Sequence, residues 1–155
     1  MKNRVIILCL ICLFSINLFS QNKETFLNIT FLTSLDEEIR LSDIKTQYTI
    51  IYFYNPECEN CTEIKKKLIK NKKLNKLIGD KTLTLIAILP DVEKQYWQKN
   101  FHFIPNNWIN AWIENDKEII SKYLKTLPAF FVLDANKNIL NATDEKQILK
   151  LIEKL

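Results

Sequence analysis

Two cysteines, Cys58 and Cys61, are separated by two residues at the point where a strand-like apolar run is followed by a helical pattern. At the N-terminus of a helix, free backbone N–H groups and the helix dipole stabilise a thiolate. The spacing brings both sulfurs to one side of the first helical turn, close enough to form and release a disulfide. The pattern predicts a redox-active dithiol in which Cys58, nearer the helix tip, attacks and Cys61, one turn deeper, resolves the mixed disulfide.

Three other uses of this cysteine pair stay open. A structural disulfide across two intervening residues would close a very small loop and would constrain the unfolded chain little. A zinc site needs further ligands and a cysteine hydrolase needs a base, and His102 is the only histidine in the chain. We therefore favour the redox dithiol and expect neither a metal ion nor a bound cofactor.

A strand and a helix are predicted to position the pair. Residues 48–54 (YTIIYFY) form a near-continuous β-branched and aromatic run, which is typical of a strand buried on both faces. Pro56 and Glu57 interrupt that run. From residue 59 to residue 78 the apolar side chains fall mostly at helical spacing, and Gly79, the only glycine, follows where a C-cap is expected. The dithiol is thus predicted at a strand-to-helix junction.

The other predicted elements alternate between strands and helices. Residues 101–116 are the exception, because their aromatic residues, Pro105 and two asparagines suggest a loop before a short helix. The remaining assignments are strands at 26–33, 82–89, 129–133 and 138–141, a turn at 134–137, a helix capped by Asp91 and running to about Asn100, a helix at 117–124 and a terminal helix capped by Asp144. Strands separated by helices imply a parallel portion, and the final hairpin adds an antiparallel one. The predicted fold class is α/β, with a mixed sheet covered by helices.

The first twenty residues have the pattern of a secretory signal peptide. Two basic residues precede an apolar stretch over residues 5–19, and Ser20 provides the small residue that a cleavage site requires. The stretch is short for a helix that spans a bilayer, although a membrane anchor left uncleaved is the alternative. We predict a signal peptide over 1–20, one domain over 21–155, and a periplasmic or secreted protein.

Composition excludes several function classes. Without residues 1–20 the basic count falls from 22 to 20 against 18 acidic residues, which leaves a charge of +2, and the cysteine count falls from four to two. A charge so small and so interspersed does not predict a nucleic-acid-binding surface. A single glycine argues against phosphate-binding loops, which need several. The apolar residues suffice for one core, and we expect a monomer.

Two stretches carry a resemblance to a known family. YFYNPECENC, around the cysteines, and TLPAFFVLD, some seventy residues later, resemble the thioredoxin-like superfamily, and within it the exported TlpA/ResA-like thiol-disulfide oxidoreductases. The likeness covers nearly all of residues 21–155 and implies a thioredoxin fold. It also implies that Leu127-Pro128 is a cis peptide facing the active site, where the neighbouring backbone pairs with a substrate strand beside Cys58. The alternative is a trans proline that merely opens a strand.

Two residues depart from the family pattern. Glu57 precedes the first cysteine where thioredoxins usually have tryptophan, and Tyr52 replaces the buried acid that many thioredoxins place six residues before that cysteine. The proton transfer assigned to that acid therefore does not carry over, and resolution would rely on water or Glu57. Glu57 and Glu59 flank Cys58, and nearby negative charge disfavours a thiolate. We predict a reduction potential nearer that of thioredoxin, about −270 mV, than that of a strong oxidase, about −120 mV.

The resemblance implies that the protein exchanges disulfides with protein thiols. A reductase would take electrons from a membrane thiol carrier and would need no soluble cofactor. A dithiol oxidase is one alternative, and a non-catalytic binding module that holds its partner with residues 101–116 is another.

Two further groups of side chains are expected to have structural roles or to face solvent. The aromatic residues Trp97, Phe101, Phe103, Trp108 and Trp112 either line a substrate groove or pack in the core, and we favour packing. His102 is expected to be an ordinary loop residue. Glu63 and the lysines that follow it, Lys65, Lys66 and Lys67, are expected to form a solvated helix face.

Overall fold

The computed structural model describes residues 29–114 and 122–155. The signal peptide predicted over 1–20, the beginning of the strand predicted at 26–33 and most of the helix predicted at 117–124 lie outside these residues. The strands are β1 (Thr30–Thr33), β2 (Glu38–Arg40), β3 (Tyr48–Phe53), β4 (Leu83–Ile88), β5 (Ile109–Trp112), β6 (Ala129–Leu133) and β7 (Ile139–Thr143). The helices are α2 (Glu59–Lys70), α3 (Lys72–Gly79), α4 (Lys94–Lys99) and α6 (Ile148–Ile152), with 3₁₀ turns η2 (Leu41–Asp43) and η3 (Phe101–Phe103).

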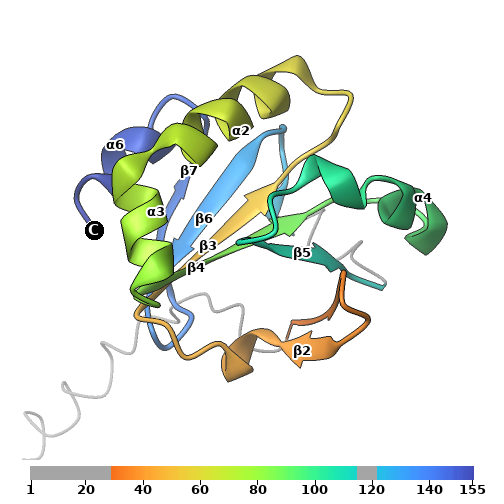
Figure 1. Ribbon diagram of the computed structural model, residues 1–155, viewed down its shortest axis with the longest axis horizontal. Coiled ribbons are helices and arrows are strands. Elements are labelled where there is room, and N and C mark those ends of the chain that lie inside the picture. Colours follow the sequence, from red (N-terminus) through yellow and green to blue (C-terminus); the bar gives the residue numbers. More distant parts are fainter. Residues whose placement is uncertain (1–28, 115–121) are drawn as a thin grey trace, which may run out of the picture.

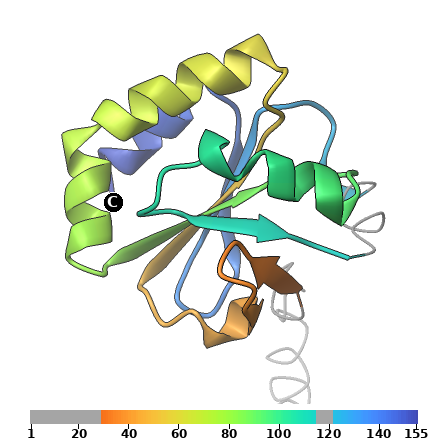
Figure 2. The same ribbon diagram turned by 45° about the vertical axis from the view of Figure 1, so that its right-hand side comes forward.

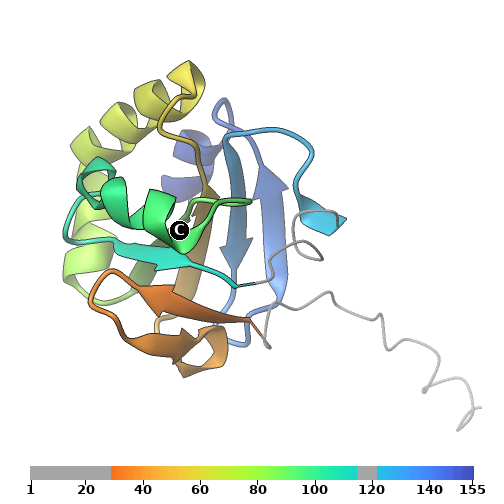
Figure 3. The same cartoon turned by 90° about the vertical axis from the view of Figure 1, so that its right-hand side faces the viewer.

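The strands form one mixed sheet in the order β2-β1-β5-β4-β3-β6-β7 (Figure 1). β4 runs parallel to β3 and to β5, whereas β6 runs antiparallel to β3 and to β7. The β1–β2 pair and the β6–β7 hairpin lie at opposite sides of the sheet (Figure 3). The predicted α/β thioredoxin fold, with a central mixed sheet flanked by helices, is confirmed.

Alternating side chains of the central strands fill two hydrophobic layers. On β3, Ile50 and Tyr52 face one layer and Ile51 and Phe53 face the other. Helices α2, α3, α4 and α6 cover the first face, and η2 lies against the second (Figure 2). β3 is therefore buried on both faces, as its unbroken apolar run predicts. Within the described residues, no helix has the length and apolar character needed to cross a membrane.

Strand β5 corrects the prediction of a loop and a short helix over 101–116. It pairs in parallel with β4, with Ile109 opposite Ile86. Asn110 is 4% exposed in the middle of this strand, and its Oδ1 accepts a hydrogen bond of 2.8 Å from Trp97 Nε1. A polar residue at a buried position breaks the apolar pattern that would predict a strand. The Asn110 side chain can be buried there only because a tertiary contact provides its hydrogen bond. The three-residue strand β2 was also missed, since it is too short for a periodicity to show.

The helix predicted over 59–78 is in fact two helices that meet at Asn71. The Asn71 side chain accepts a hydrogen bond of 2.7 Å from the Leu74 N–H and so caps α3. The prediction that Gly79 is a C-cap is wrong, because Gly79 is the last residue of α3. The left-handed backbone that ends this segment falls on Lys81, with φ 56°.

Neither of the two predicted aspartate caps is the N-cap of its helix. Asp91 does not cap α4, whose N-cap is Glu93, and it adopts a left-handed φ of 55° in the preceding turn. Asp144 does not cap α6 either, because the N-cap is Gln147, and Asp144 instead starts the turn that precedes the helix. Its Oδ1 accepts a bond of 2.9 Å from the Lys146 N–H, and its carbonyl oxygen accepts one of 3.2 Å from the Ile148 N–H.

Candidate active site

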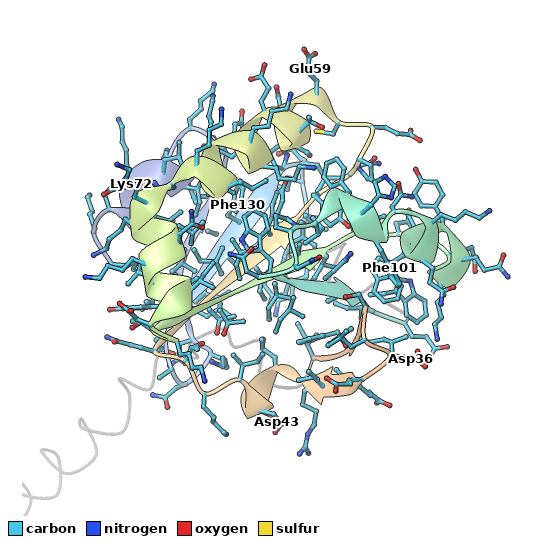
Figure 4. All side chains as sticks on the ribbon, in the orientation of Figure 1. Asp36, Asp43, Glu59, Lys72, Phe101 and Phe130 are labelled. Atoms are coloured by element: carbon cyan, nitrogen blue, oxygen red, sulfur yellow. The ribbon has the colours of Figure 1, made fainter. Side chains whose placement is uncertain are left out.

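Cys58 is the N-cap residue of helix α2, so the predicted strand-to-helix junction is confirmed. Its Sγ accepts a hydrogen bond of 3.2 Å from the backbone N–H of Cys61. This is the role that a serine or threonine oxygen plays at other helix N-termini, and it places the sulfur against the positive end of the helix dipole. Cys58 is half-buried, and the adjacent Glu59 projects outward at the beginning of α2 (Figure 4).

Cys61 lies one turn deeper, and its side chain is 0% exposed. Burial, reinforced by the hydrogen bond to Cys58, raises the pKa of the Cys61 thiol to about 12. Both cysteines are free thiols in this structure. The two residues therefore differ in the way that an attacking and a resolving thiol must differ: one sulfur is within reach of solvent and the other is enclosed.

The segment before β6 lies beside Cys58. The peptide bond between Leu127 and Pro128 is cis, as the resemblance implies. The Leu127 carbonyl oxygen lies 3.9 Å from Cys58 Sγ, although the two residues are 69 positions apart in the chain. Pro128 is buried and Leu127 half-buried. All four residues predicted for the site, the two cysteines and this pair, are thus brought together.

Tyr52 occupies the position of the missing acid, on strand β3 directly beneath α2. Its hydroxyl donates a hydrogen bond of 2.9 Å to the carbonyl oxygen of Cys61. Burial, with the nearby Cys61 and Cys58 sulfurs, raises the pKa of the Tyr52 hydroxyl, which therefore stays protonated. The ring stacks on Phe130, with 4.8 Å between centroids, and Phe130 lies between the sheet and α2 (Figure 4).

Tyr54, the residue after β3, packs in the same hydrophobic cluster as Tyr52 but differs from it in one respect. Its side chain is 0% exposed, and within the described part of the chain no hydrogen-bond partner reaches its hydroxyl. Burial raises the pKa of this hydroxyl too. Its ring stacks on Phe103, with centroids 5.2 Å apart and the planes 1° from parallel. Tyr54 is thus a packing residue with an unused polar group.

Lys65 corrects the prediction of a solvated helix face. Its ammonium donates a hydrogen bond of 2.7 Å to the Phe103 carbonyl oxygen and lies 3.1 Å from the centre of the Phe103 ring. Burial lowers the pKa of this ammonium. A lysine one helical turn beyond Cys61 therefore joins α2 to η3, whereas Glu63, Lys66 and Lys67 are exposed as predicted.

Glu57 and Tyr96 form a contact on the rim of the site. The Tyr96 hydroxyl donates a hydrogen bond of 3.0 Å to Glu57 Oε1, which raises the pKa of Tyr96. Both residues are exposed. The contact fixes the carboxylate that precedes Cys58 to helix α4, and nothing in the sequence pattern indicated Tyr96 as a site residue.

The aromatic residues between 97 and 112 are chiefly core residues, as favoured. Trp97 and Trp108 are 1% and 5% exposed, and Trp97 packs edge-on against Phe101. His102 is exposed beside a cleft of about 560 Å³ between residues 101–110 and the β1–β2 turn. Neither cysteine lines that cleft. In the described ranges no three His, Cys, Asp or Glu side chains are grouped so that they could hold a metal ion.

Comparison with known proteins finds solved structures with the same fold. No curated protein matches the chain. A conserved protein of unknown function from Bacteroides fragilis is 27% identical, with a TM-score of 0.73 over 83% of this chain and 96% of that one. A thioredoxin-like protein from Bacteroides caccae is 25% identical, with a TM-score of 0.76 over 85% of this chain and 49% of that one.

A more distant likeness concerns the fold alone. The thioredoxin domain of a thiol-disulfide oxidoreductase from Bacteroides vulgatus is 20% identical, with a TM-score of 0.69 over 85% of this chain and 95% of that one. The family model described as thioredoxin-like matches residues 46–139, a range that includes both cysteines and Pro128. Because this match spans more than half of the sequence, the chain belongs to the thioredoxin-like family.

Proposed function

We propose that the protein is a thiol-disulfide oxidoreductase whose redox-active dithiol is Cys58 and Cys61. The observation that carries this proposal is the asymmetry of the pair. Cys58 Sγ caps helix α2 within reach of solvent, while the Cys61 thiol is fully buried directly behind it. A structural disulfide has no need of this difference, whereas a two-step exchange depends on it.

The exchange proceeds in two balanced steps. The Cys58 thiolate attacks one sulfur of a substrate disulfide, a mixed disulfide forms, and the other substrate sulfur leaves as a thiolate. Cys61 then loses its proton to water and attacks the Cys58 sulfur. The second substrate thiolate leaves, so two electrons have passed to the substrate and a Cys58–Cys61 disulfide remains. The backbone at Leu127, 3.9 Å from Cys58 Sγ, would pair with the substrate chain.

The finer part of the proposal concerns direction and place. We propose an exported, TlpA/ResA-like monomer that acts on the reducing side, in the periplasm or outside the cell. Its electrons would come from a membrane thiol carrier. The sequence of residues 1–20 supports export, and the carboxylates of Glu57 and Glu59 beside Cys58 support a reducing potential. The related Bacteroides vulgatus domain carries the name thiol-disulfide oxidoreductase, which agrees with this activity.

A trapping experiment tests the activity. A Cys61→Ser variant, incubated with a protein disulfide such as insulin, is expected to accumulate a mixed disulfide through Cys58. Dithiothreitol should reduce this covalent complex. Cys58→Ser is the matched control and should form none. A parent protein that does not reduce insulin, together with a Cys61→Ser variant that traps nothing, would overturn the proposal. Capture of the same partner with both cysteines replaced would instead identify a binding module.

The reduction potential tests the direction. Equilibration of the protein over residues 21–155 with glutathione is expected to give a value nearer about −270 mV than about −120 mV. A value above roughly −150 mV would contradict the reducing role and would identify a dithiol oxidase.

A further inference from the structure

The buried tyrosine beneath the dithiol has no role in the exchange described above. We propose that Tyr52 is a positioning residue for the resolving step, and that its hydroxyl holds the first turn of α2 so that Cys61 faces the mixed disulfide on Cys58. This inference rests on the proposed exchange function and adds a residue to that same site.

The hydroxyl of Tyr52 has a fixed location, because its ring is packed on several sides. Phe130 stacks on it at 4.8 Å with planes 5° apart, and Trp108 meets it edge-on at 6.3 Å. Tyr54 lies 5.5 Å away at a tilt of 31°. The side chain is 0% exposed. A ring held by three aromatic neighbours presents its oxygen at one place under the helix.

At that place the hydroxyl meets the backbone of the resolving cysteine. It donates 2.9 Å to the Cys61 carbonyl oxygen, while the N–H of the same residue donates 3.2 Å to Cys58 Sγ. Both polar backbone groups of Cys61 are therefore held. The carbonyl oxygen is bound by Tyr52 of the sheet, and the N–H is bound by the Cys58 sulfur, which the Cys61 thiolate must attack. Loss of the Tyr52 hydroxyl would remove one of these two hydrogen bonds and leave the position of Cys61 less restrained.

The same geometry indicates that Tyr52 does not replace the acid as a proton carrier. A hydroxyl has one proton, and this proton is used in the bond to the Cys61 carbonyl. Burial also keeps the hydroxyl protonated, so it is a poor base. Tyr52 is therefore not the group that accepts the Cys61 proton, and its contribution is orientation.

Tyr54, the residue directly after β3, offers a matched control. Both tyrosines belong to the same hydrophobic cluster, both are 0% exposed, and both stack on a phenylalanine. Only the hydroxyl of Tyr52 has a partner, since that of Tyr54 has none in the described residues. Phenylalanine at either position keeps the ring and its packing and removes a single oxygen.

The test separates the two chemical steps with Ellman's disulfide. The Cys58 thiolate attacks this reagent and releases one thionitrobenzoate, leaving a mixed disulfide on Cys58. Cys61 then attacks the Cys58 sulfur, the protein disulfide forms and a second thionitrobenzoate is released. Stopped-flow absorbance resolves the two releases, and thermal unfolding of each variant confirms that it is folded.

Tyr52→Phe is expected to slow the second release by about fivefold, the factor that corresponds to one buried hydrogen bond, and to leave the first release unchanged. Tyr54→Phe is expected to leave both rates unchanged. Equal second rates in Tyr52→Phe and Tyr54→Phe would overturn the inference while the exchange function stands. A parent that releases only one equivalent would overturn the exchange function and the inference with it. In the parent, a slowly exchanging Tyr52 hydroxyl proton in NMR spectra supports the inference without any variant, and its absence contradicts it.

Discussion

The two ends of strand β3 are built in opposite ways. At its first residues, side chains close the sheet: the Lys137 ammonium is 3.1 Å from Thr49 Oγ1, and Thr46 Oγ1 donates 2.8 Å to the Tyr48 carbonyl oxygen. Lys137 is 1% exposed, although it carries a charge. At the other end the chain leaves the sheet into α2, and Cys58 Sγ lies half-buried between two backbone groups.

This difference indicates that the two ends of β3 have separate roles, one in stability and one in thiol chemistry. At the closed end, near the first residues of β3, polar groups form hydrogen bonds with one another. In the β6–β7 turn, for example, Asp134 accepts 2.9 Å hydrogen bonds from the N–H groups of Asn136 and Asn138. At the dithiol end the Cys61 N–H holds the Cys58 sulfur with the same kind of hydrogen bond, but Cys58 stays partly exposed to solvent. Stability and thiol chemistry should therefore respond to different substitutions.

The largest expected effect on stability is at the closed end. Lys137→Ala removes a buried side chain and its bond to Thr49, so it should lower the free energy of unfolding by about 2 to 4 kcal/mol. Lys137→Met keeps most of the buried stem and should cost much less. Urea unfolding gives both values. Neither variant should change the rate at which Cys58 reacts with Ellman's disulfide, and a change in that rate would break the separation between the two ends.

Alkaline pH should affect the two ends with opposite sign. The pKa of Cys61 rises from 9.0 to about 12 on folding, so above about pH 9 the folded state retains a proton that the unfolded chain has lost. Stability from this group is present below pH 9 and declines as the pH rises. Burial lowers the pKa of Lys137, so that group makes the opposite contribution.

Variants measure these two contributions by difference. Cys61→Ser should flatten the alkaline loss of stability relative to the parent, and Lys137→Met should steepen it. Unfolding midpoints between pH 7 and about pH 10.5 provide the comparison, and the contributions of the other buried groups cancel between variants. Parallel curves for the parent and Cys61→Ser would show that the thiol is not shifted in this way.

The smallest expected effect is on the rim of the dithiol. Glu57→Gln removes a negative charge next to Cys58 and should make the reduction potential less negative by about 5 to 20 mV, because exposed charges interact weakly. Glu63→Gln, an exposed carboxylate further along α2, is the matched control and should change it less. Equilibration with glutathione measures both. A shift toward more negative values in Glu57→Gln would contradict the electrostatic effect assigned to this carboxylate.

The elements nearest the dithiol could be predicted because their signals are local. The apolar run of β3, the paired cysteines at the beginning of α2 and the proline before β6 each appear within a few residues of sequence. β5 could not be predicted, because its central Asn110 is compatible with a buried strand only through Trp97 Nε1. Lys65 was assigned to solvent for a similar reason, since its partner, the Phe103 carbonyl, is 38 positions away.

The candidate site shows the same limit. Cys58, Cys61, Leu127 and Pro128 follow from spacing and from the family resemblance, but the partner of Tyr52 does not. The sequence shows that an acid is missing at position 52, yet only the three-dimensional arrangement shows that the hydroxyl there reaches the Cys61 carbonyl. An equally buried tyrosine two residues later reaches no such partner among the described residues. Hydrogen bonds across elements depend on packing that no periodicity encodes.

The separation of Cys58 and Leu127 by 69 residues also sets an order of events during synthesis. At about 5 to 20 residues per second, on the order of ten seconds pass between the addition of Cys58 and that of the segment before β6. During that interval the nascent chain carries its cysteines without the wall against which a substrate would lie. If the proposed function holds, the surface that would bind a substrate is therefore complete only after the segment before β6 has been made, and not when α2 forms.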